Sequence, residues 1–119
     1  MLTYGSVLDE DYWYPKHDWW VKIIKDLVPK IPPWVKDRQD CDGFGVMMKG
    51  LVEFYYGFNA CGIMDGKVWL DYLPGVTPEW TGHDWFSFID ETGMWSVERN
   101  GEIWKTGTNV KFQELKIYI

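Results

Sequence analysis

The spacing of hydrophobic residues changes along the chain, from a helical period in the first half to a period of two in the second half. A first helical stripe predicts a helix at about residues 16–28, which begins after Pro15 and ends at Pro29. Three prolines stand between residues 29 and 33. They predict an extended connector after this helix, because proline has no backbone N–H to donate.

A longer helical stripe predicts a second helix over residues 40–57. Asp40 is expected to cap its start and Gly57 to end it. Cys41 lies three residues before Phe44, so we expect it at the first turn, on the inward face. The apolar residues of that face stand at i, i+3, i+4, i+7, i+8, i+11 and i+12 and are Phe44, Met47, Met48, Leu51, Val52, Tyr55 and Tyr56.

Beyond residue 59, alternation of apolar and polar residues predicts strands. Residues 60–64 and 67–73 are expected to form a hairpin around the turn dipeptide Asp65-Gly66, and residues 74–82 are expected to form a loop. The remaining strands are expected at 83–89, 94–98, 102–105 and 110–119, with turns at 90–93 and at Asn100-Gly101.

Helices followed by consecutive strands predict a single α+β domain over residues 1–119. N-terminal helices, one of them long, are expected to pack on a mostly antiparallel sheet. The expected parts are an N-terminal helix with a proline-rich connector at 1–33, the long helix at 40–57, and the sheet at 60–119.

Composition and charge exclude several classes of protein. The hydrophobic fraction of 46% argues against disorder, and no apolar run reaches the roughly 18 residues that a membrane span needs. The formal net charge is −6 and the 12 Lys and Arg residues are scattered, so no nucleic-acid partner is expected. The first residues do not have the pattern of a secretion signal, so a cytoplasmic location is expected.

Nine tryptophans in 119 residues are an unusual number. Tryptophan supplies a large buried area in a small core, and it also supplies flat surfaces on which sugars or peptides stack. Most of these tryptophans lie inside periodic segments, so we expect most of them in the core.

The stretch DCDGFG places Cys41 between Asp40 and Asp42 at the start of the long helix. Two cysteines cannot make a disulfide framework, so both are expected to be free thiols. Unpaired N–H groups at a helix start stabilise a thiolate, whereas the two neighbouring carboxylates oppose it. A nucleophilic Cys41 would therefore need a cationic partner, such as a protonated histidine.

The chain offers two histidines as that partner. His17 lies in a charged stretch and is expected at the surface, whereas His83 opens a strand and is the better candidate. If residues 89 and 94 pair across the turn at 90–93, Glu98 lies diagonal to His83 and within hydrogen-bonding reach. Asn100 would then lie directly opposite His83.

Metal sites are not indicated by the spacing of possible ligands. The chain has no CxxC or HxxxH pair for zinc. A calcium loop with Gly43 at its sixth position would place Arg38 first and Lys49 twelfth, where carboxylates are required. No metal or cofactor is therefore expected.

Four motifs together resemble the transglutaminase-like branch of the papain-like cysteine fold, in particular its small bacteriophage and bacterial members. They are DCDGFG before a helix, GHDWFSFID on a strand, and WSVE and GEIW on the strands that follow. The resemblance spans about residues 34–105 and implies a papain-like core with a triad of Cys41, His83 and Glu98. The chain differs where Asp84 follows the histidine, and where Arg99 stands in a place often taken by proline.

The resemblance implies acyl transfer on amide or ester substrates, such as peptides or peptidoglycan-like molecules. Cys41 would attack the carbonyl carbon, His83 would carry the proton, and Glu98 would orient the imidazole. The backbone N–H of Cys41 would hold the oxyanion together with a second donor from Gln39 or Trp34, and Asn100 is a further supporting candidate. Water as the second reactant gives a peptidase or amidase, and an amine gives a transglutaminase.

Two alternatives stay open. One is the NlpC-type cell-wall peptidases, which begin a helix with a similar DCSGF pattern but carry a Gly-Asp-hydrophobic segment before the histidine that this chain lacks. The other is a non-catalytic module of the same fold that uses its aromatic residues to bind a sugar, a peptide or a viral or cellular protein, for example within a virion.

Overall fold

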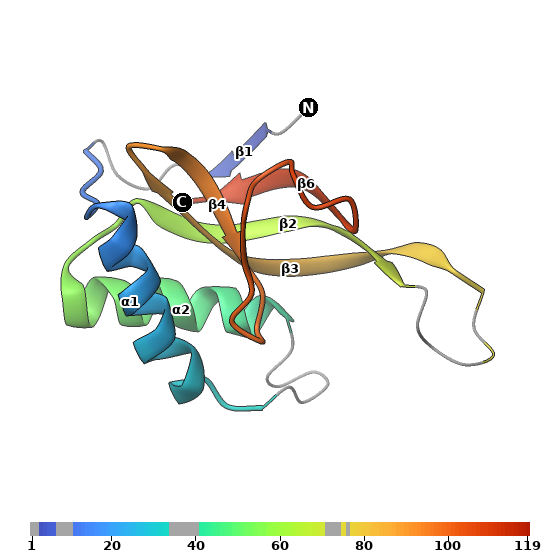
Figure 1. The fold of residues 1–119 in the computed structure, drawn as a ribbon, viewed down its shortest axis with the longest axis horizontal. Coiled ribbons are helices and arrows are strands. Elements are labelled where there is room, and N and C mark those ends of the chain that lie inside the picture. Colours follow the sequence, from blue (N-terminus) through green and yellow to red (C-terminus); the bar gives the residue numbers. More distant parts are fainter. Residues whose placement is uncertain (1–2, 7–10, 34–40, 71–74, 76) are drawn as a thin grey trace.

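Figure 1 shows two helices lying against one face of a curled sheet. The computed structural model describes residues 3–6, 11–33, 41–70, 75 and 77–119, and for residues 3–6, 41 and 42 it describes the backbone alone. The helices are α1 (His17–Leu27), the short 3-10 helix η1 (Val28–Lys30) and α2 (Cys41–Tyr56). The strands are β1 (Thr3–Ser6), β2 (Cys61–Leu70), β3 (Glu79–Asp90), β4 (Gly93–Val97), β5 (Ile103–Lys105) and β6 (Phe112–Tyr118).

The sheet has the strand order β1-β6-β2-β3-β4-β5. Neighbouring strands from β6 to β5 are antiparallel, and β1 joins the edge in parallel with β6. The predicted α+β class, with helices packed on a mostly antiparallel sheet, is therefore confirmed. The parallel edge strand β1 lies in a segment for which no strand is predicted.

The main core lies between the helices and the facing side of the sheet. Phe86 and Phe88 of β3 point into it, whereas Trp85 and Ile89 belong to a second cluster on the other face, because successive side chains alternate along a strand. The buried residues of the main core are Trp20, Ile23, Ile24, Leu27, Ile31, Phe44, Met48, Val52, Cys61, Phe86, Phe88 and Val97.

The second cluster shows that the sheet curls. The rings of Trp104 on β5 and Phe112 on β6 lie 4.3 Å apart, and Trp104 Nε1 donates a hydrogen bond to Glu114 Oε1 at 3.0 Å. β5 and β6 are not neighbours in the sheet, so they meet only because the sheet bends around Trp85, whose ring lies 5.2 Å from Phe112. The face away from the helices is therefore the inside of a half-barrel.

The predicted hairpin at Asp65-Gly66 is wrong, because β2 runs through both residues. A Cβ atom at Gly66 would lie 2.0 Å from the carbonyl oxygen of Gln113 and 2.7 Å from the ring of Trp85. The register against β6 also shifts between these two residues. Glycine is required here for close packing at a bulge and not for a turn. The predicted loop at 74–82 is likewise wrong at its end, where Glu79 already begins β3.

Helix α2 covers the predicted span, but its last turn does not belong to the core. Tyr55 is 62% exposed and Tyr56 36% exposed, although both continue the helical stripe. The hydroxyl of Tyr56 instead donates a hydrogen bond to Asp26 of α1. The end of α2 thus extends past the buried part of the sheet, and its aromatic residues face solvent.

The tryptophans divide between the core and the surface. Trp20, Trp85 and Trp104 are buried. Trp13, Trp19 and Trp80 are exposed, and Trp34 lies outside the described residues. None of the helices in the described part of the chain is long and apolar enough to cross a membrane.

Candidate functional site

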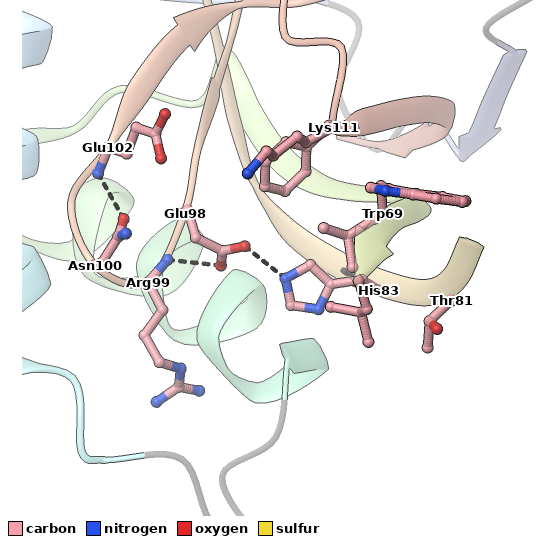
Figure 2. A pocket seen from close by; sticks show the side chains of 12 residues that line it. Trp69, Thr81, His83, Glu98, Arg99, Asn100, Glu102 and Lys111 are labelled. Atoms are coloured by element: carbon pink, nitrogen blue, oxygen red, sulfur yellow. Dashed lines mark hydrogen bonds and ion pairs between the residues drawn. The ribbon is translucent and has the colours of Figure 1, made fainter. Parts of the chain in front are cut away.

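The histidine and the acid of the predicted triad lie in contact. His83 Nε2 is 2.6 Å from Glu98 Oε2 (Figure 2). The predicted hairpin register is also confirmed, since Ile89 pairs with Met94 across the turn. The last pair between β3 and β4 is Phe86 with Val97, so Glu98 is the first residue to leave the ladder and its side chain can reach back to His83.

A tight turn after β4 orients the carboxylate of Glu98. The backbone N–H of Arg99 donates to Glu98 Oε1 at 2.8 Å, so each carboxylate oxygen accepts one hydrogen bond. The turn closes through a bond from Gly101 N to Glu98 O at 2.9 Å, and Gly101 has φ +91°. This positive φ explains why the Asn100-Gly101 dipeptide stands here.

Asn100 belongs to this turn and not to a strand opposite His83. Its side-chain oxygen accepts a hydrogen bond from the backbone N–H of Glu102 at 2.9 Å. The ladder ends three residues before Asn100, so the expected cross-strand contact with His83 does not form. Asn100 supports the site by shaping the turn that presents Glu98.

The hydrogen bond to Glu98 decides which nitrogen of His83 is available for chemistry. An ionised carboxylate only accepts hydrogen bonds, so Nε2 carries the proton and donates it. Nδ1 then holds the lone pair, and no partner for it lies among the described residues. The side chains of His83 and Glu98 are 25% and 18% exposed, which limits competition from water for the bond between them. This is the arrangement of an oriented general base.

An open pocket of about 740 Å³ lies beside the pair, at one end of the half-barrel. Figure 2 shows Glu98 and His83 in its centre, with Lys111 and Glu102 above them in the view. The described residues that line it come from β2, β3, the turn after β4 and the start of β6 with the residue before it: Val68, Trp69, Leu70, Thr81, Gly82, His83, Glu98, Arg99, Asn100, Glu102, Lys111 and Phe112. The pocket therefore leaves open space beside the imidazole of His83.

The predicted nucleophile stands at the start of α2, because Cys41 is its first residue. The side chain of Cys41 lies outside the described residues, as do Trp34, Gln39 and the predicted cap Asp40. One described contact connects the start of α2 to the pocket: the guanidinium of Arg99 lies 5.4 Å from the ring centre of Phe44, three residues after Cys41. Helix α2 also packs directly on β3.

The side of β3 that carries His83 determines how a thiol could approach it. His83 shares the face of Trp85, whereas Asp84 shares the opposite face with Phe86, as strand alternation predicts. β2 pairs with β3 on one side of His83, opposite Gly66, but β4 ends before it reaches His83, so the other edge of β3 has no described strand beside it at this point. Helix α2 packs on the face of Phe86, so a thiol at its start would have to pass this edge of β3 to meet His83.

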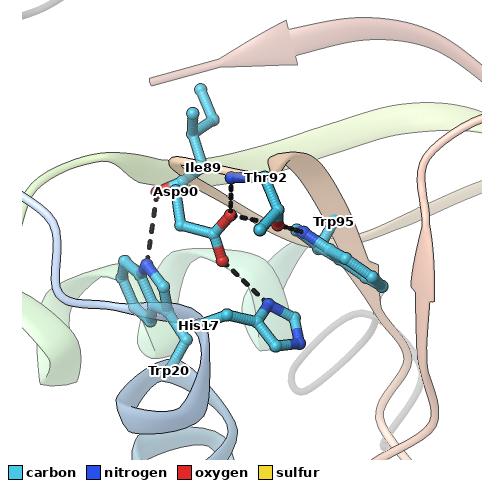
Figure 3. Close-up of polar contacts among 6 residues, drawn as sticks. All are labelled: His17, Trp20, Ile89, Asp90, Thr92 and Trp95. Atoms are coloured by element: carbon cyan, nitrogen blue, oxygen red, sulfur yellow. Dashed lines mark hydrogen bonds and ion pairs between the residues drawn. The ribbon is translucent and has the colours of Figure 1, made fainter.

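The second histidine forms another carboxylate pair, which the sequence does not predict. His17 Nδ1 lies 2.8 Å from Asp90 Oδ2, and the His17 ring is 4.4 Å from the ring of Trp95 (Figure 3). The interpretation of His17 as a surface residue is therefore wrong, since its side chain is only 27% exposed. The pair connects the start of α1 to the end of β3, next to the turn that leads to β4.

Asp90 is the central acceptor of this contact. Thr92 donates to Asp90 Oδ1 from its backbone N–H at 2.7 Å and from its hydroxyl at 2.5 Å. Burial opposes the charge of Asp90, but the two bonds from Thr92 and the one from His17 outweigh it and hold the pKa of the carboxyl below its ordinary value. The Asp-x-Thr spacing in a turn is the local signal for the Thr92 bonds.

We expect Asp90→Asn to lower the free energy of unfolding at pH 7 by about 1–3 kcal/mol, because it removes a charged acceptor of three hydrogen bonds. A lowered pKa in the folded state stabilises the protein above the ordinary carboxyl pKa near 4, and this stabilisation is lost as the pH falls. The difference between wild type and variant should therefore narrow below about pH 4. Urea unfolding at a series of pH values measures this difference in the free energy of unfolding. A difference that stays constant down to pH 2 would contradict the role given to the ionised carboxylate of Asp90.

Cys61 is not a second nucleophile. Its side chain is fully buried in the main core, and this burial raises the pKa of the thiol to about 12, although the nearby Lys49 partly counteracts it. Lys49 Nζ donates to the carbonyl oxygen of Cys61 at 2.7 Å, which is a structural contact at the start of β2. Within the described residues, no group of three or more His, Cys, Asp or Glu side chains could hold a metal ion.

Comparison with protein-family models and with curated protein sequences gives no match to this chain. The functional conclusion therefore rests on the residues and their geometry.

Proposed function

We propose that this chain is a cysteine-dependent acyl-transfer domain of the papain-like, transglutaminase-like type, with Cys41 as nucleophile, His83 as base and Glu98 as the residue that orients it. The observation that carries the proposal is the 2.6 Å contact between His83 and Glu98 beside an open pocket. The register of the hairpin predicts this contact from the sequence, and a helix begins at Cys41.

The chemistry follows from the two imidazole nitrogens. His83 Nδ1 takes the proton of the Cys41 thiol, and the thiolate attacks the carbonyl carbon of an amide or ester. The oxyanion that forms is held by the backbone N–H of Cys41 and by a second donor from Gln39 or Trp34. When the intermediate collapses, the carbon–nitrogen or carbon–oxygen bond breaks and His83 returns the proton to the leaving group. A thioester on Cys41 remains.

The second half of the reaction releases the acyl group from Cys41. His83 takes a proton from water or from an amine, which attacks the thioester carbon, and the thiolate leaves. Water gives hydrolysis, and an amine gives transamidation. Throughout, Glu98 keeps its hydrogen bond to Nε2 and stabilises the imidazolium that forms in each half.

A reactive ester tests this proposal without knowledge of the natural substrate. We expect p-nitrophenyl acetate to release a burst of about one equivalent of p-nitrophenolate and to leave an acetyl group on Cys41, which intact-mass and peptide mass spectrometry detect. Cys41→Ala should abolish both signals. Cys61→Ala is the matched control and should keep them, because Cys61 is buried away from solvent. Acetylation that persists in Cys41→Ala would contradict the proposal.

A second candidate function is a binding module of the same fold. The observation that favours it is a set of exposed aromatic side chains on the helices and just before them: Trp13, Tyr14, Trp19, Phe54 and Tyr55. Such side chains can stack on a sugar or pack on a protein partner. This function does not need a reactive thiol, so the acetylation experiment separates the two candidates.

A further inference from the structure

We infer that Arg99 is a positioning residue that holds the start of the nucleophile helix against the His83–Glu98 pair. This inference rests on the proposed function and assigns a task to a residue that the triad itself does not include. Its basis is that Arg99 contacts the neighbouring acid Glu98 and two distant segments of the chain, the connector at Pro32 and helix α2 at Phe44.

The first contact is with the acid. The backbone N–H of Arg99 donates to Glu98 Oε1, while Glu98 Oε2 is bound to His83 (Figure 2). The backbone of Arg99 is therefore directly linked to the orientation of the imidazole. Figure 2 shows its guanidinium pointing away from the pair, so the side chain has a different task from the backbone.

The second contact is with the nucleophile helix. The guanidinium carbon lies 5.4 Å from the centre of the Phe44 ring, within the range of a cation–π interaction. Phe44 is buried in the main core and fixed there, with 1% of its surface exposed. It stands one helical turn after Cys41, so this contact fixes the position of the helix start relative to the turn that carries Glu98.

The third contact is with the connector that leads toward the helix. Arg99 Nη1 donates to the carbonyl oxygen of Pro32 at 2.7 Å. Proline-rich connectors have no internal hydrogen bonds of their own, so an outside donor helps to fix their path. One side chain thus binds the segment before the nucleophile and the helix that carries it. A planar guanidinium can stack on a ring and donate from its edge at the same time, which a lysine ammonium cannot do.

If Arg99 positions the helix start, its loss should uncouple the thiol from His83 without removing either group. We expect Arg99→Ala to lower the rate of Cys41 alkylation by iodoacetamide at pH 6 by about tenfold, since a smaller fraction of the thiol is ionised. At pH 9.5 the rate should stay within about twofold of wild type, because an ordinary thiol is also ionised there. Arg99→Lys should recover part of the loss at pH 6 through its charge.

Controls separate this role from general destabilisation. Lys67→Ala removes the same charge from an exposed position on β2 and should leave the alkylation profile unchanged. Phe44→Leu removes the stacking surface at the other end of the contact and should lower the pH 6 rate in the same direction as Arg99→Ala, while the rate at pH 9.5 stays within about twofold of wild type. Because Phe44 is also a core residue, the unchanged rate at pH 9.5 is what distinguishes lost positioning from lost folding, and the variant provides this test even if Arg99→Ala does not fold.

Two different results would overturn two different claims. If the dependence of Cys41 alkylation on pH is the same in the wild type and in His83→Ala, the proposed function itself is contradicted. If the alkylation profile changes after His83→Ala but the profiles of Arg99→Ala and Phe44→Leu overlay that of the wild type, the proposed function stands. The role of Arg99 is then contradicted.

Discussion

Replacing Trp20 with alanine is expected to lower the free energy of unfolding by about 3–5 kcal/mol, the largest effect on stability that we predict. Trp20 is fully buried at the centre of the main core. Its ring stacks on Phe88 of β3 at 4.9 Å, and its Nε1 donates to the carbonyl oxygen of Ile89 at 3.2 Å. The substitution would leave a cavity between α1 and the sheet, and the partly buried carbonyl of Ile89 would lose this hydrogen bond.

The neighbouring Trp19 provides a matched control on the same helix. It is 57% exposed, and its main described contact is with the ammonium group of Lys22, 4.8 Å from the ring. We expect Trp19→Ala to change the free energy of unfolding by less than about 1 kcal/mol. Urea unfolding followed by circular dichroism measures both variants. Equal losses at the two positions would contradict the packing of α1 described above.

The parts of the fold that the sequence predicts correctly are set by local patterns. The helical stripes of α1 and α2 need only the spacing of apolar residues within each segment. The register of β3 and β4 is set by the short turn at residues 90–93, and once Ile89 pairs with Met94 the reach of Glu98 to His83 follows. For this reason the strongest feature of the candidate site is predictable from sequence alone.

The parts that the sequence does not predict depend on contacts between distant segments. Asp65-Gly66 has the composition of a turn, yet the close approach of Gln113 from β6 makes it a packed bulge inside a long strand. The strand that packs here is nearly fifty residues away in the sequence, so the residues around Asp65-Gly66 do not predict its approach. The same holds for His17, whose partner Asp90 lies 73 residues further along the chain.

The exposure of the end of α2 is also not predicted by the helical pattern. Tyr55 and Tyr56 continue the apolar period of Met48 and Val52, but the sheet beneath them does not extend so far. Tyrosine is compatible with either environment, because its ring packs and its hydroxyl can be hydrated. Periodicity identifies the face of a helix but does not show how much of that face is covered.

The second large effect that we predict concerns the reactivity of Cys41, and it follows from the His83–Glu98 contact. A free thiol with a pKa near 8.5 is ionised to only about 0.3% at pH 6. A thiol whose proton is taken by His83 Nδ1 is largely ionised at this pH, as an ion pair with the imidazolium. Removal of the imidazole should thus lower the reactive fraction at pH 6 by a factor on the order of 100.

Glu98→Gln provides a graded comparison. It keeps the shape of the side chain but removes the negative charge that stabilises the imidazolium. In this variant the rate of Cys41 alkylation at pH 6 should lie between the rates of the wild type and of His83→Ala. Cys61 does not contribute to the signal, because burial raises its thiol pKa to about 12.

The most direct test of the proposed function is the rate of iodoacetamide alkylation of Cys41 between pH 5 and pH 10, in the wild type and in His83→Ala. We predict a wild-type rate that is already high at pH 6, and a variant rate that is lower at pH 6 by a factor on the order of 100 and rises only near pH 8.5. A wild-type thiol that itself titrates near 8.5, with the same profile after His83→Ala, would contradict it.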